Sequence, residues 1–241
     1  MPNLVWAVAQ NLRYYNSFSI FEAARVFFAS ECPSPYDSLE KLPLQKKHIG
    51  GAFVDTYDNL DNLFRNAKGV LEHMPRYTHM EEFKFIRNHK PVWAEDSVWL
   101  NIYIGESKIG DIALMSKATA LDCGIKNNAV ILFELDEESL KPYTSRTNKF
   151  SHLPKYLINS FDLSIVVDKS VSWQTISSVV LDVKKDNSFL MDCVFVDEYH
   201  GKQIEENKKS ISLRLSIGSN EKTLTSSEIN DCASMVIAAL E

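Results

Sequence analysis

One stretch near the C-terminus constrains the fold more than any other. Within Ser210–Ile217 every second residue is Ile or Leu, and the residues between them are Ser or Arg. A period of two is typical of a β-strand with one buried and one solvated face. Thr225-Ser-Ser-Glu228 follows, and Thr and Glu at this spacing form a capping box that satisfies two free backbone donors at a helix start. The sequence therefore predicts a strand followed by a capped helix.

The residues before this strand supply the other elements of a small domain. Leu163, Ile165 and Val167 alternate with Asp162, Ser164 and Asp168, which suits a strand with one solvated face. Ser172 can cap a helix whose apolar face begins at Trp173. Phe189–Tyr199 is the next expected strand. The order strand, helix, strand, strand, helix is that of a ferredoxin-like split βαβ fold without its last strand. We therefore expect three strands in this sheet.

The first part of the chain predicts a mixture of helices and strands. The expected helices are residues 2–14, residues 60–74 with Val70 on the inward face and Pro75 as the stop, and residues 118–122. The expected strands are residues 17–29, 49–54, 82–87, 97–105, 108–116 and 129–135. Residues 31–43 contain three prolines and predict an exposed loop. The polar residues 142–149 separate two expected domains, 1–142 and 150–241, of an α+β protein.

Composition and charge limit the function classes. The chain has 241 residues, of which 45% are hydrophobic, and no apolar run reaches the ~18 residues of a membrane span. The net charge is −6, and from Lys149 onward ten Lys and Arg face thirteen Asp and Glu. This balance argues against broad, non-specific binding of nucleic acid. Any RNA contact in the second part must come from a local patch.

No catalytic or metal-binding constellation stands out. The six histidines lack helical metal-site spacing and predict surface or loop positions, and the four cysteines lie far apart, which predicts reduced, buried thiols in a cytoplasmic protein. Phosphate-cradling glycine loops and nucleophile elbows are missing from the sequence. Gly50-Gly51 predicts a bend beside a strand. We expect no catalytic residue, metal or cofactor in this chain.

The polar face of the last strand is the candidate binding surface. A face that carries hydroxyls, Lys and Arg and is left uncovered by helices suits RNA loops, and a nearby tyrosine suits base stacking. The candidate residues are Tyr199, Lys202, Lys208, Ser212 and Arg214. The alternative is an ordinary solvated sheet face.

Several short segments of the second part match one known module in the same order. They are Phe150-Ser151 with Pro154, Asp162-Leu163, Tyr199, Gly201, Ile204, Lys208-Lys209-Ser210, Leu213-Arg214-Leu215, Thr223-Leu224-Thr225 and Glu228-Ile229-Asn230. These segments resemble the ferredoxin-fold anticodon-binding domain that ends bacterial phenylalanine–tRNA ligase β chains.

The first part independently resembles the second half of the catalytic-like domain of the same chain. Phe21–Phe27 is similar to its Phe-Glu-Ile-Gly-Arg-Val-Phe strand, Ala67-Lys68-Gly69 to its Ala-Lys-Gly helix, and Phe133–Asp136 to its closing strand. The resemblance implies a class II synthetase-like antiparallel sheet with helices but without an active site. Two matches in the right order are more specific than either one alone.

This resemblance implies a C-terminal portion of the β chain and its partners. In the family the β chain assembles with an α chain as α2β2, and the α chain holds ATP, Mg²⁺ and the adenylate chemistry. The terminal module binds the anticodon stem-loop of tRNA(Phe). One departure is the family's basic pair before the first strand of this module, which is replaced here by Ile158-Asn159-Ser160-Phe161-Asp162 and so loses positive charge.

Two rival interpretations remain. A freestanding ferredoxin-like module could bind RNA or an amino acid without a ligase partner, but an amino-acid sensor would need a glycine-rich loop after the first strand, and Asp168–Ser172 has none. An independent hydrolase or transferase would need a nucleophile beside a base, and no such grouping is found.

Overall fold

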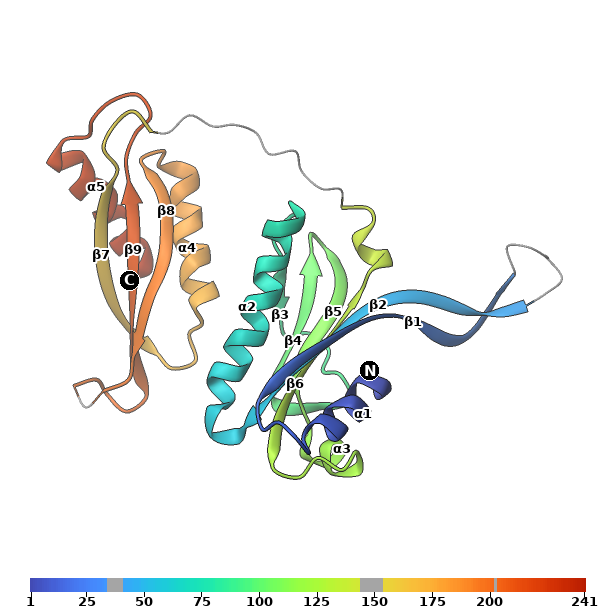
Figure 1. Cartoon of the computed structure of the whole chain (residues 1–241). Coiled ribbons are helices and arrows are strands. Elements are labelled where there is room, and N and C mark those ends of the chain that lie inside the picture. The colour runs from blue at the N-terminus through green and yellow to red at the C-terminus, as the bar shows by residue number, and fades with distance from the viewer. Residues whose placement is uncertain (34–40, 144–153, 202) are drawn as a thin grey trace. The chain divides into compact units, whose positions relative to one another are not determined.

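The computed structural model describes residues 1–33, 41–143, 154–201 and 203–241, which form two compact units, Met1–Lys149 and Phe150–Glu241 (Figure 1). The helices are α1 Pro2–Asn11, α2 Leu60–Thr78, α3 Lys117–Asp122, α4 Trp173–Asp186 and α5 Ser226–Leu240, with short 3-10 helices η1 Tyr57–Asn59 and η2 Glu138–Leu140. The strands are β1 Phe18–Pro33, β2 Lys41–Thr56, β3 Lys84–Ile86, β4 Ala94–Ile104, β5 Ser107–Met115, β6 Asn128–Asp136, β7 Asn159–Asp168, β8 Leu190–Tyr199 and β9 Lys208–Ile217.

The first unit is an antiparallel sheet with helices on both faces. Its strand order is β1-β2-β6-β5-β4-β3. Because successive side chains of a strand point to opposite faces, Leu132 of β6 packs with α1 and α3, whereas Phe133 packs with α2. Each face therefore has its own core, as the near-continuous apolar sequence of β6 requires.

The first two strands form an arm that extends past this sheet (Figure 1). β2 pairs with β6 only over His48–Thr56, but it pairs with β1 from Lys41 onward. The expectation of a loop over residues 31–43 is therefore wrong for both of its ends, which are paired strand, while residues 34–40 lie outside the described part of the chain. Prolines are tolerated here because a two-stranded ribbon leaves one edge of each strand without hydrogen-bond partners.

Two further expectations for the first unit are corrected. α2 does not stop at Pro75 but continues to Thr78 and ends at His79, which adopts the left-handed conformation with φ 55°. A proline removes only its own bond to the preceding turn, so one more turn can form. Val70, expected on the inward face, is 47% exposed.

Gly50 and Gly51 form no bend but lie within the regular pairing of β2. The ring of Phe133 occupies the space beside Gly51, where a Cβ atom would lie 2.1 Å from a ring carbon. Gly51 is therefore needed for the close approach of this ring to the β2 backbone.

The second unit is the small α+β domain that the sequence predicts. Its antiparallel sheet has the order β7-β9-β8, which gives three strands among the described residues. Both helices cover the same face, where their apolar residues pack on the inward residues of β9. Ser172 caps α4, and the capping box of Thr225 and Glu228 at the start of α5 is confirmed. The other face of this sheet is covered by no helix among the described residues of this unit.

Candidate nucleic-acid interface

The central strand β9 has the two faces that the sequence predicts. Ile211, Leu213, Leu215 and Ile217 are fully buried under α4 and α5. Lys208, Ser210, Ser212, Arg214 and Ser216 alternate with them and lie on the uncovered side, half-buried or exposed. We call this uncovered side of β7, β9 and β8 the open face.

The flanking strands bring polar partners onto the open face. Ser160, Asp162 and Ser164 of β7 lie directly opposite Ser216, Arg214 and Ser212 of β9. The hydroxyls of Ser164 and Ser212 are hydrogen-bonded at 2.9 Å. On the other side, Tyr199 of β8 lies opposite Ser210 and is half exposed. The centre of the open face is thus a row of hydroxyls with an aromatic ring at one end.

The cations of the open face are already paired with carboxylates. Arg214 donates to Asp162 through Nε at 2.6 Å and through its terminal nitrogen at 2.8 Å. The hydrogen bond from Arg214 lowers the pKa of Asp162, and the same contact raises the pKa of Arg214. Lys208 forms an ion pair with Glu205 at 3.0 Å. Of the candidate cations that the structure describes, Arg214 is therefore held by a carboxylate before any ligand arrives, and Lys208 has a carboxylate beside it.

The open face as a whole does not attract anions. Among the described residues it carries the carboxylates Asp162, Asp168, Asp192 and Asp197 but only the cations Lys208 and Arg214. A phosphate backbone gains little from such a surface. The open face suits a single-stranded loop better than a phosphate backbone. Its hydroxyls can bond to base edges and 2′-hydroxyls, and its exposed ring can stack on a base.

Tyr199 packs against Gly201, two residues further along the chain. A Cβ atom at position 201 would lie 1.9 Å from the hydroxyl oxygen of Tyr199, so only glycine leaves room for the ring. The neighbouring Glu198 accepts from His200 at 2.8 Å and from the buried Lys209 at 3.2 Å. Burial raises the pKa of Glu198, but these hydrogen bonds outweigh it and lower the pKa overall.

Lys209 could have been recognised from the sequence, since its position matches the apolar side of β9. Lys209 lies on the helix-covered side of β9 with Ile211 and Leu213, and there it donates to the carboxylate of Glu198. The structure therefore brings Tyr199, Lys208, Ser212 and Arg214 onto one sheet. Lys202 lies outside the described residues.

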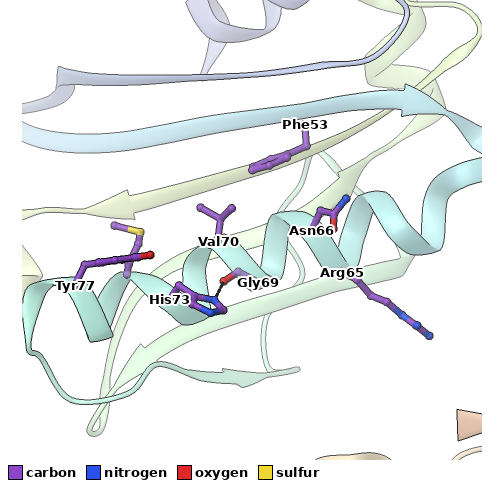
Figure 2. A pocket seen from close by; sticks show the side chains of 8 residues that line it. Phe53, Arg65, Asn66, Gly69, Val70, His73 and Tyr77 are labelled. Carbon is purple, nitrogen blue, oxygen red and sulfur yellow. Dashed lines mark hydrogen bonds between the residues drawn. The ribbon is translucent and has the colours of Figure 1, made fainter. Parts of the chain in front are cut away.

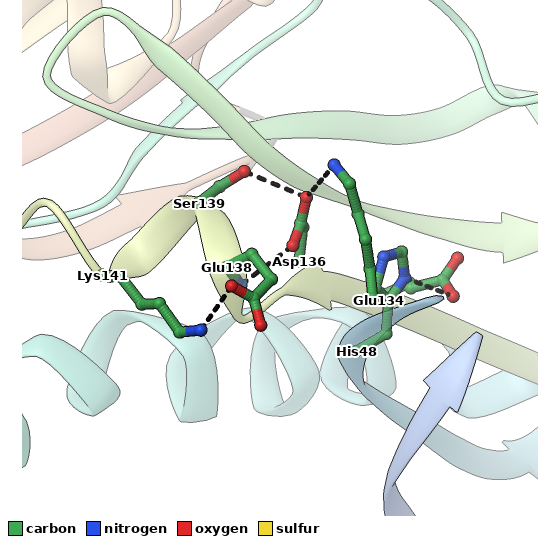
Figure 3. Close-up of polar contacts among 7 residues, drawn as sticks. His48, Glu134, Asp136, Glu138, Ser139 and Lys141 are labelled. Carbon is green, nitrogen blue, oxygen red and sulfur yellow. Dashed lines mark hydrogen bonds and ion pairs between the residues drawn. The ribbon is translucent and has the colours of Figure 1, made fainter. Parts of the chain in front are cut away.

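A second polar cluster lies in the first unit, at the base of the arm (Figure 3). His48 Nδ1 lies 3.0 Å from Glu134, and Lys46 donates to Asp136 at 3.0 Å. Burial raises the pKa of Asp136, but hydrogen bonds from Lys46 and Ser139 lower it further than burial raises it. The side chain of His48 is only 16% exposed, so the expectation of a surface histidine is wrong here. These contacts join β2 to β6 where the arm leaves the sheet.

The prediction that the cysteine thiols are buried holds for only some of the cysteines. Cys232 is buried and Cys193 half-buried, and burial raises the pKa of Cys193 to about 11, whereas Cys123 is exposed.

Within the described ranges, no three His, Cys, Asp or Glu side chains gather as metal ligands would. None of the helices in the described part of the chain has the length and apolar character that crossing a membrane requires.

Comparison with known families gives two matches, one for each of the two units. The family described as "Phenylalanyl tRNA synthetase beta chain CLM domain" matches residues 1–137, and "Ferredoxin-fold anticodon binding domain" matches residues 154–241. Together with the two sheets, these matches define a chain of the aminoacyl-tRNA synthetase class that carries an anticodon-binding domain. The chain belongs to the phenylalanyl-tRNA synthetase β-chain family.

Curated relatives agree with this assignment. The chain is 26% identical to the phenylalanine–tRNA ligase β subunit of Bacillus subtilis over 250 residues and 26% identical to that of Carboxydothermus hydrogenoformans over 248 residues. Both alignments cover 100% of this chain but 30% of the relative. Among solved structures, a pyrrolysyl-tRNA synthetase of Desulfitobacterium hafniense is similar with a TM-score of 0.45 and 12% identity, over 58% of this chain and 46% of that chain.

Proposed function

We propose that this chain is a non-catalytic part of a cytoplasmic phenylalanine–tRNA ligase, in which the second unit binds the anticodon stem-loop of tRNA(Phe). The observation that carries this proposal is the open face of β7, β9 and β8 within the region that matches the anticodon-binding family. The first unit packs against the ligase α chain, which holds ATP and Mg²⁺ as an α2β2 partner. This chain supplies binding and scaffolding to that enzyme.

The open face recognises bases and riboses more than phosphates. Its hydroxyls, from Ser164, Ser210 and Ser212 among others, can donate and accept toward base edges and 2′-hydroxyls. Tyr199 stacks on one unpaired base, since its ring is half exposed. The excess of carboxylates over cations on the open face keeps a regular, double-stranded backbone away from the sheet, because like charges repel. An anticodon loop has unstacked bases and therefore fits this surface.

The test is binding of the full chain to tRNA(Phe), measured by fluorescence anisotropy at several salt concentrations, beside an unrelated tRNA. We expect selective binding whose logarithmic salt slope is about −0.7 to −1.5, because only one or two phosphates are contacted. A slope several times steeper would show that the phosphate backbone dominates and would refute base recognition by the open face.

The same assay is repeated with the α chain added. Binding that appears only in its presence means that recognition needs the assembled ligase, and the scaffolding part of the proposal then stands. Selective RNA binding without any association with the α chain would favour the freestanding RNA-binding module instead. Lack of tRNA binding in both conditions would overturn the anticodon-binding role.

A further inference from the structure

Helix α2 has a glycine at its centre. Gly69 lies in the middle of a 19-residue helix, and a Cβ atom added there would have nothing within 4 Å. Glycine weakens a helix interior relative to alanine. Within the described residues no neighbour uses the space that the missing side chain leaves. Glycine on a helix surface allows another backbone to approach closely, so the position indicates a contact with something outside the first unit.

An open apolar groove runs past Gly69 (Figure 2). It has a volume of about 580 Å³ and is lined by Phe53 of β2 and by Arg65, Asn66, Gly69, Val70, His73, Met74 and Tyr77 of α2. Val70 is 47% exposed and Tyr77 is 82% exposed. His73 Nδ1 lies 2.8 Å from the carbonyl oxygen of Gly69, which holds the imidazole against the helix.

The sheet beside the groove is also uncovered. Phe21 of β1 pairs with Gly51, and side chains of paired residues share a face, so Phe21 lies on the α2 side of the sheet together with Phe53 and Phe133. Phe27 follows at an even spacing along the same regular register. Phe21 is 80% exposed and Phe27 is 63% exposed. α2 packs over β2 and β6 but leaves this outer strip of the same face open.

The shape and charge of this surface specify its occupant. A helix lying beside α2 would cover Phe21, fill the groove and meet α2 at Gly69, since packed helices lie 8–10 Å apart and come closest over small residues. The groove is lined by the cation Arg65 and by His73, and none of its eight lining residues is acidic. An apolar helix face flanked by carboxylates is therefore complementary to it.

A second copy of this chain fits less well. Antiparallel pairing of two α2 helices about Gly69 would place Arg65 of one copy opposite His73 of the other, and neither groove lining supplies a carboxylate for Arg65. We propose that the groove along α2 docks an acidic amphipathic helix of the ligase α chain. This inference rests on the proposed function, because it names the surface through which the first unit meets that partner.

The test compares variants of the full chain in their affinity for the α chain of the same organism. Gly69→Leu and Val70→Asp are the groove variants, and Leu121→Asp is the matched control, since Leu121 is a 58% exposed helical residue outside the groove. We expect both groove variants to weaken association by about tenfold or more, as changes at a buried interface centre do, and the control to leave it unchanged.

A second readout separates docking from misfolding. Gly69→Leu puts a good helix former where nothing would clash, so its melting temperature in the absence of the α chain should be equal to or higher than that of the wild type. Higher stability together with weaker association is the expected signature.

Three outcomes would count against the inference. Wild-type-like affinity of both groove variants would overturn it while leaving the proposed function intact. Failure of the wild-type chain to bind the α chain would refute the scaffolding role and this inference with it. Self-association in sedimentation that Gly69→Leu abolishes, with α-chain affinity unchanged, would make a second copy the occupant.

Discussion

Arg214 and Asp162 lie directly opposite each other on β9 and β7, and two hydrogen bonds of 2.6 and 2.8 Å join the guanidinium to the carboxylate. Such bidentate pairs are the strong form of charge-assisted hydrogen bonding. The strongest cation of the open face is thus held by its own neighbour. Any contact of Arg214 with an RNA phosphate must compete with Asp162, so this pair sets how far the open face can use charge.

Replacement of Asp162 should release this cation. In Asp162→Asn the amide no longer carries the charge that neutralises Arg214, and one carboxylate leaves the open face. We expect tighter binding to tRNA and a salt slope that is steeper by about 0.7, which corresponds to one added phosphate contact on a single-stranded loop. The measurement is anisotropy with tRNA(Phe) over a series of salt concentrations.

The matched control for this variant is Asp192→Asn. Asp192 lies on the same face and gives the same change of net charge, but it is opposite Ser216 rather than a cation. A smaller gain is therefore expected. Equal effects of the two variants would mean that overall charge, and not the release of Arg214, controls affinity.

Reversal of the charge at Arg214 should have the opposite effect. Arg214→Glu places two carboxylates opposite each other on the open face and removes a donor, so the assembled ligase should bind tRNA(Phe) about tenfold more weakly. Formation of phenylalanyl-adenylate, measured by pyrophosphate exchange, should be unchanged because it needs no tRNA contact.

Lys185→Glu serves as the control for this charge change, since Lys185 is 75% exposed on α4, the helix that covers the other face of the sheet. Unchanged tRNA affinity of Arg214→Glu would argue that the open face is not the RNA-binding surface.

The second unit was largely predictable from sequence, because local patterns determine it. The alternation in Ser210–Ile217 fixes which residues of β9 are buried, and Thr225 with Glu228 fixes where α5 begins. The pairing of Arg214 with Asp162 was not predictable, since it depends on the register between two strands 52 residues apart. Register arises from the whole sheet and cannot be seen in either strand alone.

The first unit shows where local patterns fail. Val70 fits a helical apolar stripe, but α2 presents it to the groove because the buried stripe consists of Leu63, Ala67 and Leu71. The sequence around Gly51 predicts a bend, but the structure shows that a glycine is required there because the ring of Phe133, 82 residues away, packs against it. In both cases the deciding contacts are made with residues that are distant in sequence.

The capping box of α5 gives a stability prediction. Thr225 Oγ1 accepts from the backbone N–H of Glu228, and the Glu228 carboxylate accepts from the backbone N–H of Thr225 at 2.8 Å. Thr225→Ala should lower the free energy of unfolding of the second unit by about 1 kcal/mol. The check is urea denaturation, with Thr223→Ala as the control, because Thr223 is exposed and its side chain has no hydrogen bond within the described residues.

The same cap predicts a dependence of stability on pH. The hydrogen bond from Lys222, followed by that from the backbone of Thr225, lowers the pKa of Glu228 from 4.5 to about 2. Because the folded state favours the ionised form, this contribution is complete above pH 4.5 and is lost as the pH falls toward 2. Glu228→Gln should therefore lose stability at neutral pH and show a flatter decline between these values. Parallel curves for wild type and variant would contradict the assignment.

The last prediction concerns the buried pair that anchors β8 beside Tyr199. The side chain of Lys209 is only 9% exposed and meets Glu198 at 3.2 Å, whereas the ion pair of Lys208 with Glu205 joins side chains that are 39% and 76% exposed. Glu198→Gln leaves a buried ammonium group without its counter-charge and should cost about 1–3 kcal/mol. Glu205→Gln should change stability by less than about 0.5 kcal/mol, because solvent already screens that pair.

Hydrogen exchange of the β9 amides distinguishes the two variants, since it reports on the opening of the second unit alone. Protection should fall in Glu198→Gln and stay near the wild-type level in Glu205→Gln. Glu198→Gln should also weaken tRNA binding, because the end of β8 that presents Tyr199 loses the side-chain ion pair that supports its pairing with β9. Equal loss of protection in both variants would show that burial of Lys209 does not determine the strength of its ion pair.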